Sequence, residues 1–165
     1  MKIGILSDTH NNTKMIQKAV SVFKSRKVDY VIHAGDITSS RMIDFFKGLN
    51  CKFVLGNCDC DIEIINEKSR SLGFGNTEKS FEFTIDNEIF LVFHGNNVPL
   101  FRKAVASGKY DYIIKGHTHF YEDYVSNGTV IINPGSLNKD KGGFIIILYT
   151  EKRKIEKIYL SLDSS

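Results

Sequence analysis

The stretch KIGILSDTH, residues 2–10, sets a pattern that the rest of the chain repeats. Its apolar run KIGIL is typical of a buried strand. The polar residues Asp8 and His10 follow at the point where that strand would end. Four later segments show the same order, an apolar strand and then a short polar motif. These pairs are VDYVIH and AGD at 28–36, KFVL and GNCD at 52–59, IFLVF and HG at 89–95, and DYIIK and GHTH at 111–119.

The first third of the chain alternates these strands with helical patterns. Thr13 is a candidate N-cap for a helix whose apolar residues recur at helical spacing up to Phe23. Ser39 or Ser40 is a candidate cap for a second helix that runs to Leu49. The order strand, helix, strand, helix, strand favours a parallel sheet with right-handed crossovers.

The later part of the chain favours antiparallel strands joined by hairpins. The turn signals lie at 86–87, 127–128 and 151–154. A helix is expected over 98–106, followed by Gly108. The weakly periodic stretch 61–79 indicates a loop or a short helix that could act as a lid or a partner site. Parallel strands followed by antiparallel ones predict an α/β fold, a four-layer α-β-β-α sandwich of two mixed sheets with outer helices.

Length and composition are typical of a globular protein. At 165 residues the chain is long enough to bury its own core, and we expect a single domain over 1–165. With 42% hydrophobic and 25% charged residues, it is neither a disordered chain nor a fibre. The net charge of +3 favours anionic ligands only slightly.

The sequence predicts neither secretion nor membrane insertion. Asp8 ends the N-terminal apolar stretch before it reaches the length of a signal core. The run FIIILY at 144–149 has the size of a strand, far short of a membrane span. Cys51, Cys58 and Cys60 lack the spacing of a disulfide framework and are expected to be reduced thiols. We therefore predict a cytoplasmic protein without membrane contact.

Side chains that bind metal ions gather in the polar motifs. Because ligands bind outside the carboxyl ends of the strands in α/β folds, neighbouring loops are expected to bring these side chains into one pocket. Oxygen and imidazole donors suit Mn²⁺, Fe²⁺ or Zn²⁺ better than they suit a cysteine-rich structural zinc site. Seven ligands are too many for one ordinary ion and suit two ions that share a carboxylate. The seven are Asp8, His10, Asp36, Asn57, His94, His117 and His119.

Each motif taken alone has a simpler explanation as a surface pair, a core histidine or a turn. Their joint placement weakens that explanation, because four of the five histidines follow predicted strands. His33 lies inside a strand and is expected in the core or behind the ligands. The pairs Asp8 with His10 and His117 with His119 would face one pocket if extended, or diverge toward two adjacent ions if they lie in loops.

The ordered motifs resemble those of the calcineurin-like metallophosphoesterases, above all the small single-domain phosphodiesterases of the YfcE type. The matching segments are Asp8-Thr9-His10, Gly35-Asp36, Gly56-Asn57-Cys58-Asp59, His94-Gly95, Gly116-His117-Thr118-His119 and NPGS at 133–136. They span most of the chain. The resemblance implies the same sandwich fold and two divalent ions, Mn²⁺ first, with Ni²⁺, Fe²⁺ or Zn²⁺ as alternatives.

The resemblance also implies a role for each ligand. One ion would be held by Asp8, His10 and His119. The other would be held by Asn57, His94 and His117, with Asp36 as the bridge. Asn57 and His94 are in addition candidate catalytic residues. The amide of Asn57 offers both an acceptor and donors, so it can meet metal and substrate together.

One position departs from the family pattern. Larger members carry a histidine after the asparagine, which is thought to act as a general acid or to steady the transition state, and this chain has Cys58 there. A thiol with an ordinary pKa of about 8.5 is a poor substitute. Cys58 is thus a candidate catalytic residue with a simpler interpretation as a packing residue. The change suggests another proton donor or substrates with good leaving groups.

These observations predict hydrolysis of a small phosphoester, most of all a phosphodiester, by water activated between two metal ions. One alternative is a non-catalytic scaffold, like the retromer subunit that shares this fold, although the intact ligands argue for catalysis. A nuclease is less favoured, because the charge is only +3 and no nucleic-acid domain is appended. The sequence is compatible with an oligomer.

Overall fold

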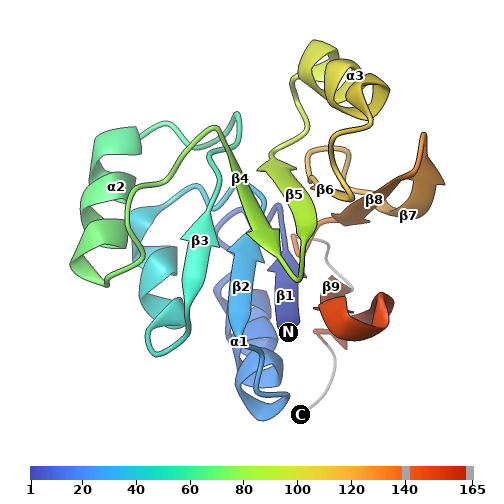
Figure 1. Cartoon of the computed structure of the whole chain (residues 1–165). Helices are drawn as coiled ribbons and strands as arrows, with labels where there is room; N and C mark the ends of the chain where they lie inside the picture. Colours follow the sequence, from blue (N-terminus) through green and yellow to red (C-terminus); the bar gives the residue numbers. More distant parts are fainter. Residues whose placement is uncertain (139–141, 163–165) are drawn as a thin grey trace.

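The computed structural model describes residues 1–138 and 142–162, and its elements are drawn in Figure 1. The strands form two sheets, with orders β10-β9-β1-β2-β3 and β4-β5-β6-β8-β7. The first sheet is built from β1 (Lys2–Leu6), β2 (Tyr30–His33), β3 (Cys51–Phe53), β9 (Gly142–Tyr149) and β10 (Lys154–Ser161). The second sheet is built from β4 (Ser80–Ile85), β5 (Glu88–Phe93), β6 (Tyr112–Ile114), β7 (Tyr121–Ser126) and β8 (Thr129–Pro134).

Both sheets contain parallel and antiparallel neighbours. In the first, β1, β2 and β3 run parallel, while β9 and β10 are antiparallel additions. In the second, β5, β6 and β8 run parallel between the antiparallel strands β4 and β7. The three predicted hairpins are present, and the charged turn between β9 and β10 includes the short 3₁₀ helix η2 (Thr150–Lys152). The prediction of two mixed sheets is confirmed.

Three apolar clusters separate four layers. Successive residues of a strand point to opposite faces, so Leu6 of β1 packs toward the helices while Ile5 packs toward the second sheet. The outer face of the first sheet is covered by α1 (Thr13–Ser25), η1 (Ser40–Phe46) and α2 (Ile62–Ser71). α3 (Val98–Ser107) covers the second sheet through Ala104. The layer order is the predicted α-β-β-α, and it explains why β1 is apolar on both faces.

Two of the predicted helices differ from the prediction in detail. Asn12, rather than Thr13, caps α1, because its side-chain oxygen accepts from the backbone N–H of Met15 at 3.2 Å. An asparagine side chain is at least as good an N-cap as threonine. The second helix is capped by Ser39 as predicted, but it is a 3₁₀ helix that ends at Phe46, because Lys47 has extended backbone angles.

The stretch 61–79 contains α2, so the short-helix alternative is the one observed. α3 covers the predicted range and ends at Gly108, whose left-handed backbone (φ 60°) terminates the helix. No helix within the described ranges is both long enough and apolar enough to cross a membrane.

The loops that follow the parallel strands meet at one end of the sandwich and bond to one another across the two sheets. His94, which follows β5, places its ring Nδ1 2.8 Å from the carbonyl of Ala34, which follows β2. The N–H of Gly116 donates to the carbonyl of His94 at 2.8 Å. The N–H of His117 donates to the Asp8 carboxylate at 3.1 Å. These bonds hold the polar motifs of both sheets together.

Candidate metal centre

Most of the predicted ligands lie on backbone in the left-handed region, which residues other than glycine seldom adopt. The φ angles are 52° at Asp8, 40° at His10, 60° at Asp36, 72° at His117 and 61° at His119. Such strained conformations persist only where the surrounding structure holds them, and they concentrate at functional sites. The loop bonds between the two sheets supply that support.

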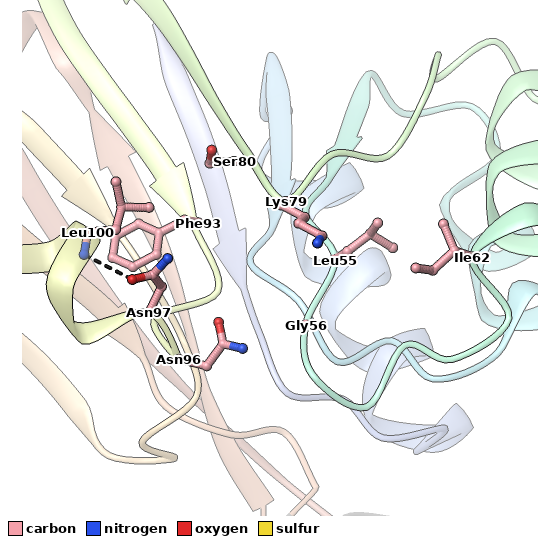
Figure 2. A pocket seen from close by; sticks show the side chains of 9 residues that line it. All are labelled: Leu55, Gly56, Ile62, Lys79, Ser80, Phe93, Asn96, Asn97 and Leu100. Carbon is pink, nitrogen blue, oxygen red and sulfur yellow. Dashed lines mark hydrogen bonds between the residues drawn. The ribbon is translucent and has the colours of Figure 1, made fainter.

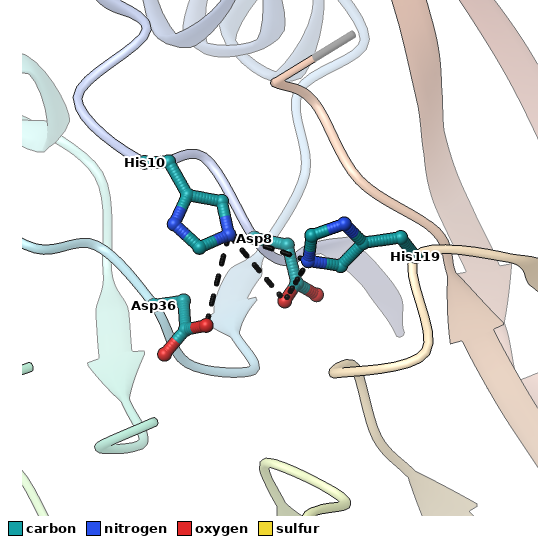
Figure 3. A group of neighbouring side chains, drawn as sticks. All are labelled: Asp8, His10, Asp36 and His119. Carbon is teal, nitrogen blue, oxygen red and sulfur yellow. Dashed lines mark hydrogen bonds and ion pairs between the residues drawn. The ribbon is translucent and has the colours of Figure 1, made fainter. Parts of the chain in front are cut away.

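Four of the predicted ligands form one compact group, shown in Figure 3. One ligand atom from each of Asp8, His10, Asp36 and His119 lies within 4.8 Å of the others. The Nε2 atoms of His10 and His119 are 3.3 Å apart. Asp8 Oδ1 lies 3.2 Å from the Nε2 of His119, and Asp36 Oδ2 lies 3.7 Å from that of His10. The loops after β1, β2 and β6 thus converge on one point.

His94 adjoins this group from the second sheet. Its Nε2 lies 3.3 Å from Asp36 Oδ2 and 3.9 Å from Asp8 Oδ1. The Nδ1–Ala34 contact fixes the ring and leaves Nε2 available for a metal ion. The ring of His117 packs edge-on against His94, with centroids 5.2 Å apart. His117 and His119 therefore diverge, His119 toward Asp8 and His117 toward His94, as a looped rather than an extended segment would place them.

The loop after β3 reaches Asp36 through its backbone. The N–H of Cys58 donates to Asp36 Oδ1 at 2.9 Å. Asn57 and Cys58 are both exposed, and the Asn57 side-chain amide contacts the Cys58 sulfur at 3.3 Å. Asn57 thus lies beside the group, with its amide bonded to a neighbour in sequence rather than to the other predicted ligands.

The donor atoms of this centre fit a divalent cation. Asp8 Oδ1 and His94 Nε2 are buried, and neither makes a hydrogen bond within the described part of the chain. Buried polar atoms are normally satisfied, and these two have only their ion-pair contacts, Asp8 Oδ1 with His119 and His94 Nε2 with Asp36, so both can still bind a cation. Carboxylate and imidazole are the ligands that Mn²⁺, Fe²⁺ and Zn²⁺ share.

Asp59 organises the loops around Asp36. It is buried, and its carboxylate accepts from the backbone N–H groups of Asp36 (3.0 Å), Thr38 (2.7 Å) and Gly56 (2.7 Å). These bonds join the loop after β2 to the loop after β3. The sequence alone left open whether Asp59 orients a neighbouring group or merely finishes a turn, and these bonds support the first alternative.

Two further supporting residues come from the NPGS segment. Asn133 donates from its side-chain amide to the carbonyl of Gly116 at 3.0 Å and to the Thr118 hydroxyl at 2.9 Å. Ser136 donates from its hydroxyl to the carbonyl of Asp8 at 2.9 Å. The segment therefore holds the loops that carry the ligands. The only signal for it in the sequence was the family resemblance of NPGS.

Burial and charge pairing together shift the pKa values of several side chains in and behind the centre. Burial opposes ionisation of Asp36, but the neighbouring His94 ring and the Cys58 N–H hold the pKa of Asp36 well below its usual range. Burial likewise disfavours a charged His94, yet Asp36 and the Ala34 carbonyl raise the pKa of its ring. Burial lowers the pKa of His33 to about 3, so this ring, 3.0 Å from the Thr9 hydroxyl, is a neutral core residue.

Cys58 carries a neutral thiol at physiological pH. Partial burial, together with the adjacent Asp36 carboxylate, raises the pKa of Cys58 to about 11. Burial also raises the pKa of Asp59, although its backbone bonds act in the opposite direction.

The fold and this centre define a class of protein. The model of the calcineurin-like phosphoesterase superfamily domain matches residues 1–153, and the chain belongs to this family, whose enzymes act on phosphoric ester bonds. The predicted family and enzyme class are confirmed.

Individual relatives agree with the family match. The chain is 35% identical to a phosphodiesterase of Methanocaldococcus jannaschii, over 97% of this chain and 99% of the relative. The solved structure of an archaeal phosphodiesterase is 34% identical, with a TM-score of 0.89, over 97% of this chain and 100% of the other. The phosphoesterase YfcE from E. coli is 16% identical over 96% and 98% of the two chains, with a TM-score of 0.71, and shows a shared fold.

Proposed function

We propose that the chain is a divalent-metal-dependent phosphodiesterase that hydrolyses a small phosphate diester with water as the nucleophile. The observation that carries the proposal is the convergence of two buried carboxylates with imidazoles from both sheets, in which Asp8 Oδ1 and His94 Nε2 make no hydrogen bond with a described residue. The name of the M. jannaschii relative supports the diester as the substrate.

The ligands divide between two ions as the family pattern implies. Asp8, His10 and His119 form one set, and their contacts around Asp8 Oδ1 support this grouping. His94 and His117 pack together and form the second set with Asn57. Asp36 lies next to both His10 and His94, which suits it as the bridging carboxylate. Mn²⁺ is the ion we expect first, since the donor set is hard to borderline.

Two bound divalent ions would neutralise negative charge on the phosphoryl oxygens and would lower the pKa of a bound water molecule. The chain's own groups prepare the site for this chemistry. Asp36 is held ionised by its surroundings, so its charge is available at neutral pH. The contact of His94 Nδ1 with Ala34 orients Nε2 into the centre. The exposed amide of Asn57 can turn from the Cys58 sulfur to donate to a phosphoryl oxygen.

Metal removal and restoration test the proposal. Protein purified without chelator, stripped of metal and shown by circular dichroism to be folded, is expected to leave bis(4-nitrophenyl) phosphate intact. Adding back Mn²⁺ is expected to restore turnover, with ion content measured by atomic emission. Folded protein that takes up Mn²⁺ and still fails to hydrolyse this diester or any other in a phosphoester panel would contradict the proposal.

Cys58→Ala is expected to change kcat/KM by no more than about threefold, as for a surface substitution worth about 0.5 kcal/mol. The hydrogen bond from the backbone N–H of residue 58 to Asp36 Oδ1 is retained by alanine, and only the weak contact of the thiol with that carboxylate is lost. The neutral thiol supplies no charge to lose. Steady-state kinetics on bis(4-nitrophenyl) phosphate, with Cys60→Ala as the matched control, measures the effect. A loss of a hundredfold or more in Cys58→Ala alone would assign the thiol a catalytic role.

A further inference from the structure

A cleft opens beside the metal centre, between the end of the first sheet and the start of α3 (Figure 2). Its volume is about 350 Å³, within the range of pockets that bind small ligands. One wall is formed by Leu55 and Ile62, around the loop after β3. The facing wall is formed by Phe93 and Leu100, at the end of β5 and in α3.

The cleft adjoins the predicted ligands through two residues of its lining. Gly56 lines the cleft, and a Cβ atom on it would lie 2.0 Å from Asp36 Oδ1, so the glycine is in direct contact with that carboxylate. Phe93 lines the opposite wall and is followed directly by His94. A phosphate bound near Asp36 and His94 would therefore have the cleft as its neighbour.

The lining of the cleft combines apolar walls with polar groups that have no partner in the described ranges. Lys79 forms no ion pair or hydrogen bond with a described residue, and its ammonium extends into the cleft. Asn96 extends its amide from the opposite wall and is likewise unbonded there. Asn97, by contrast, is engaged in capping α3. Polar groups make up more of the exposed lining than apolar ones, so the cleft suits a ring that carries a polar substituent better than a purely apolar group.

We propose that this cleft binds one ester group of the substrate, and that this group contains a ring that carries an anionic substituent. The inference rests on the proposed function, because it takes the metal centre as the site of the phosphate. The side chains of Ile62 and Leu100, on opposite walls, would contact the ring, and Lys79 would pair with the anionic substituent.

Binding of non-hydrolysable phosphonates to the Mn²⁺-loaded protein tests the inference without relying on turnover. In isothermal titration calorimetry, phenylphosphonate is expected to bind about tenfold more tightly than methylphosphonate, because only the first can bury a ring. Ile62→Asp is expected to reduce this ratio to within about twofold by placing a charge in the apolar wall. Ile64→Asp, on the same helix and also exposed, is the matched control and should keep the tenfold ratio.

The role of Lys79 is tested with a second pair of ligands. 4-Phosphonobenzoate, which adds a carboxylate to the ring, is expected to bind about fivefold more tightly than phenylphosphonate, as for a partly desolvated ion pair of about 1 kcal/mol. Lys79→Ala should abolish that advantage, whereas Lys14→Ala, an exposed lysine on α1, should retain it.

The outcomes separate this inference from the proposed function. If both phosphonates bind with equal affinity and Ile62→Asp changes nothing, the cleft is not a subsite, while the phosphate-binding metal centre stands. If a ring preference is present but Lys79→Ala keeps the carboxylate advantage, the anionic part of the inference is wrong. If neither phosphonate binds the Mn²⁺-loaded protein, the proposed function itself is contradicted.

Discussion

Asp36→Asn is expected to abolish metal-dependent hydrolysis while the protein stays folded. Asp36 is 2% exposed and lies between His10 and His94, and it is one of the two carboxylates of the group, so asparagine removes half of its negative charge. Asparagine keeps the shape and an oxygen that can accept from the Cys58 N–H, as Asp36 Oδ1 does at 2.9 Å. The substitution thus removes a ligand charge without opening a cavity.

The expected loss in kcat/KM is about 10³-fold or more. Metal ions contribute several kcal/mol to transition-state stabilisation, and each 1.4 kcal/mol is a factor of ten in rate. Hydrolysis of bis(4-nitrophenyl) phosphate at saturating Mn²⁺ measures the loss of activity. Atomic emission measures the loss of bound metal ions. In the metal-free state, the free energy of unfolding is expected to stay within about 1 kcal/mol of the parent.

Asp44→Asn is the matched control for this experiment. Asp44 lies on η1, is half-exposed and pairs with Lys68 at 3.1 Å on the surface, so its substitution should leave activity within about twofold. If the chain were a scaffold that had lost catalysis, Asp36→Asn would change neither activity nor partner binding. Full activity in Asp36→Asn would show that the bridging carboxylate has been wrongly assigned.

Gly56→Ala is expected to disrupt the centre by steric overlap. A Cβ atom at this position would lie 2.0 Å from Asp36 Oδ1 and 2.6 Å from the backbone nitrogen of Asp36, so the loops after β2 and β3 would have to separate. Separation would also lengthen the Asp59 bonds that join them. We expect a loss of about 3 kcal/mol in the free energy of unfolding. We also expect a loss of about 10²-fold or more in kcat/KM, since a misplacement of 1 Å can cost that much.

Gly48→Ala provides the comparison. Gly48 has a φ of 83°, and a Cβ atom there would meet nothing within 4 Å. Only backbone strain is added, about 1–2 kcal/mol, and activity should be unchanged. Chemical denaturation and kinetics on both variants separate strain from overlap. Equal destabilisation of both, with hydrolysis intact in each, would contradict the steric argument.

Much of the fold could be predicted because its signals are local. β1 is apolar throughout because one face meets the helices and the other meets the second sheet. Hairpin turns such as Asn127-Gly128 are visible in the sequence because their residues tolerate positive φ, and both adopt it here. The parallel arrangement of β5, β6 and β8 could not be predicted in this way, because no hairpin turn with a recognisable sequence joins these strands.

The candidate centre could be located, but its geometry could not be derived from spacing. Two residues at i and i+2 share a side only in extended backbone. His117 and His119 both have left-handed φ angles, and they point to different partners. The role of Asp59 could not be decided from the sequence either, because its partners are backbone N–H groups, which do not depend on the type of side chain.

The pairing of β1 with β9 has a consequence for the folding of the chain during its synthesis. During synthesis on the ribosome β1 emerges early, but its antiparallel neighbour β9 follows only after all five strands of the second sheet. His10 and His119, whose rings meet, are separated by 109 positions. A nascent chain that lacks His119 therefore lacks one member of the proposed ligand group. Capture of metal at the proposed centre therefore has to wait until His119 and the strands that position it have been made.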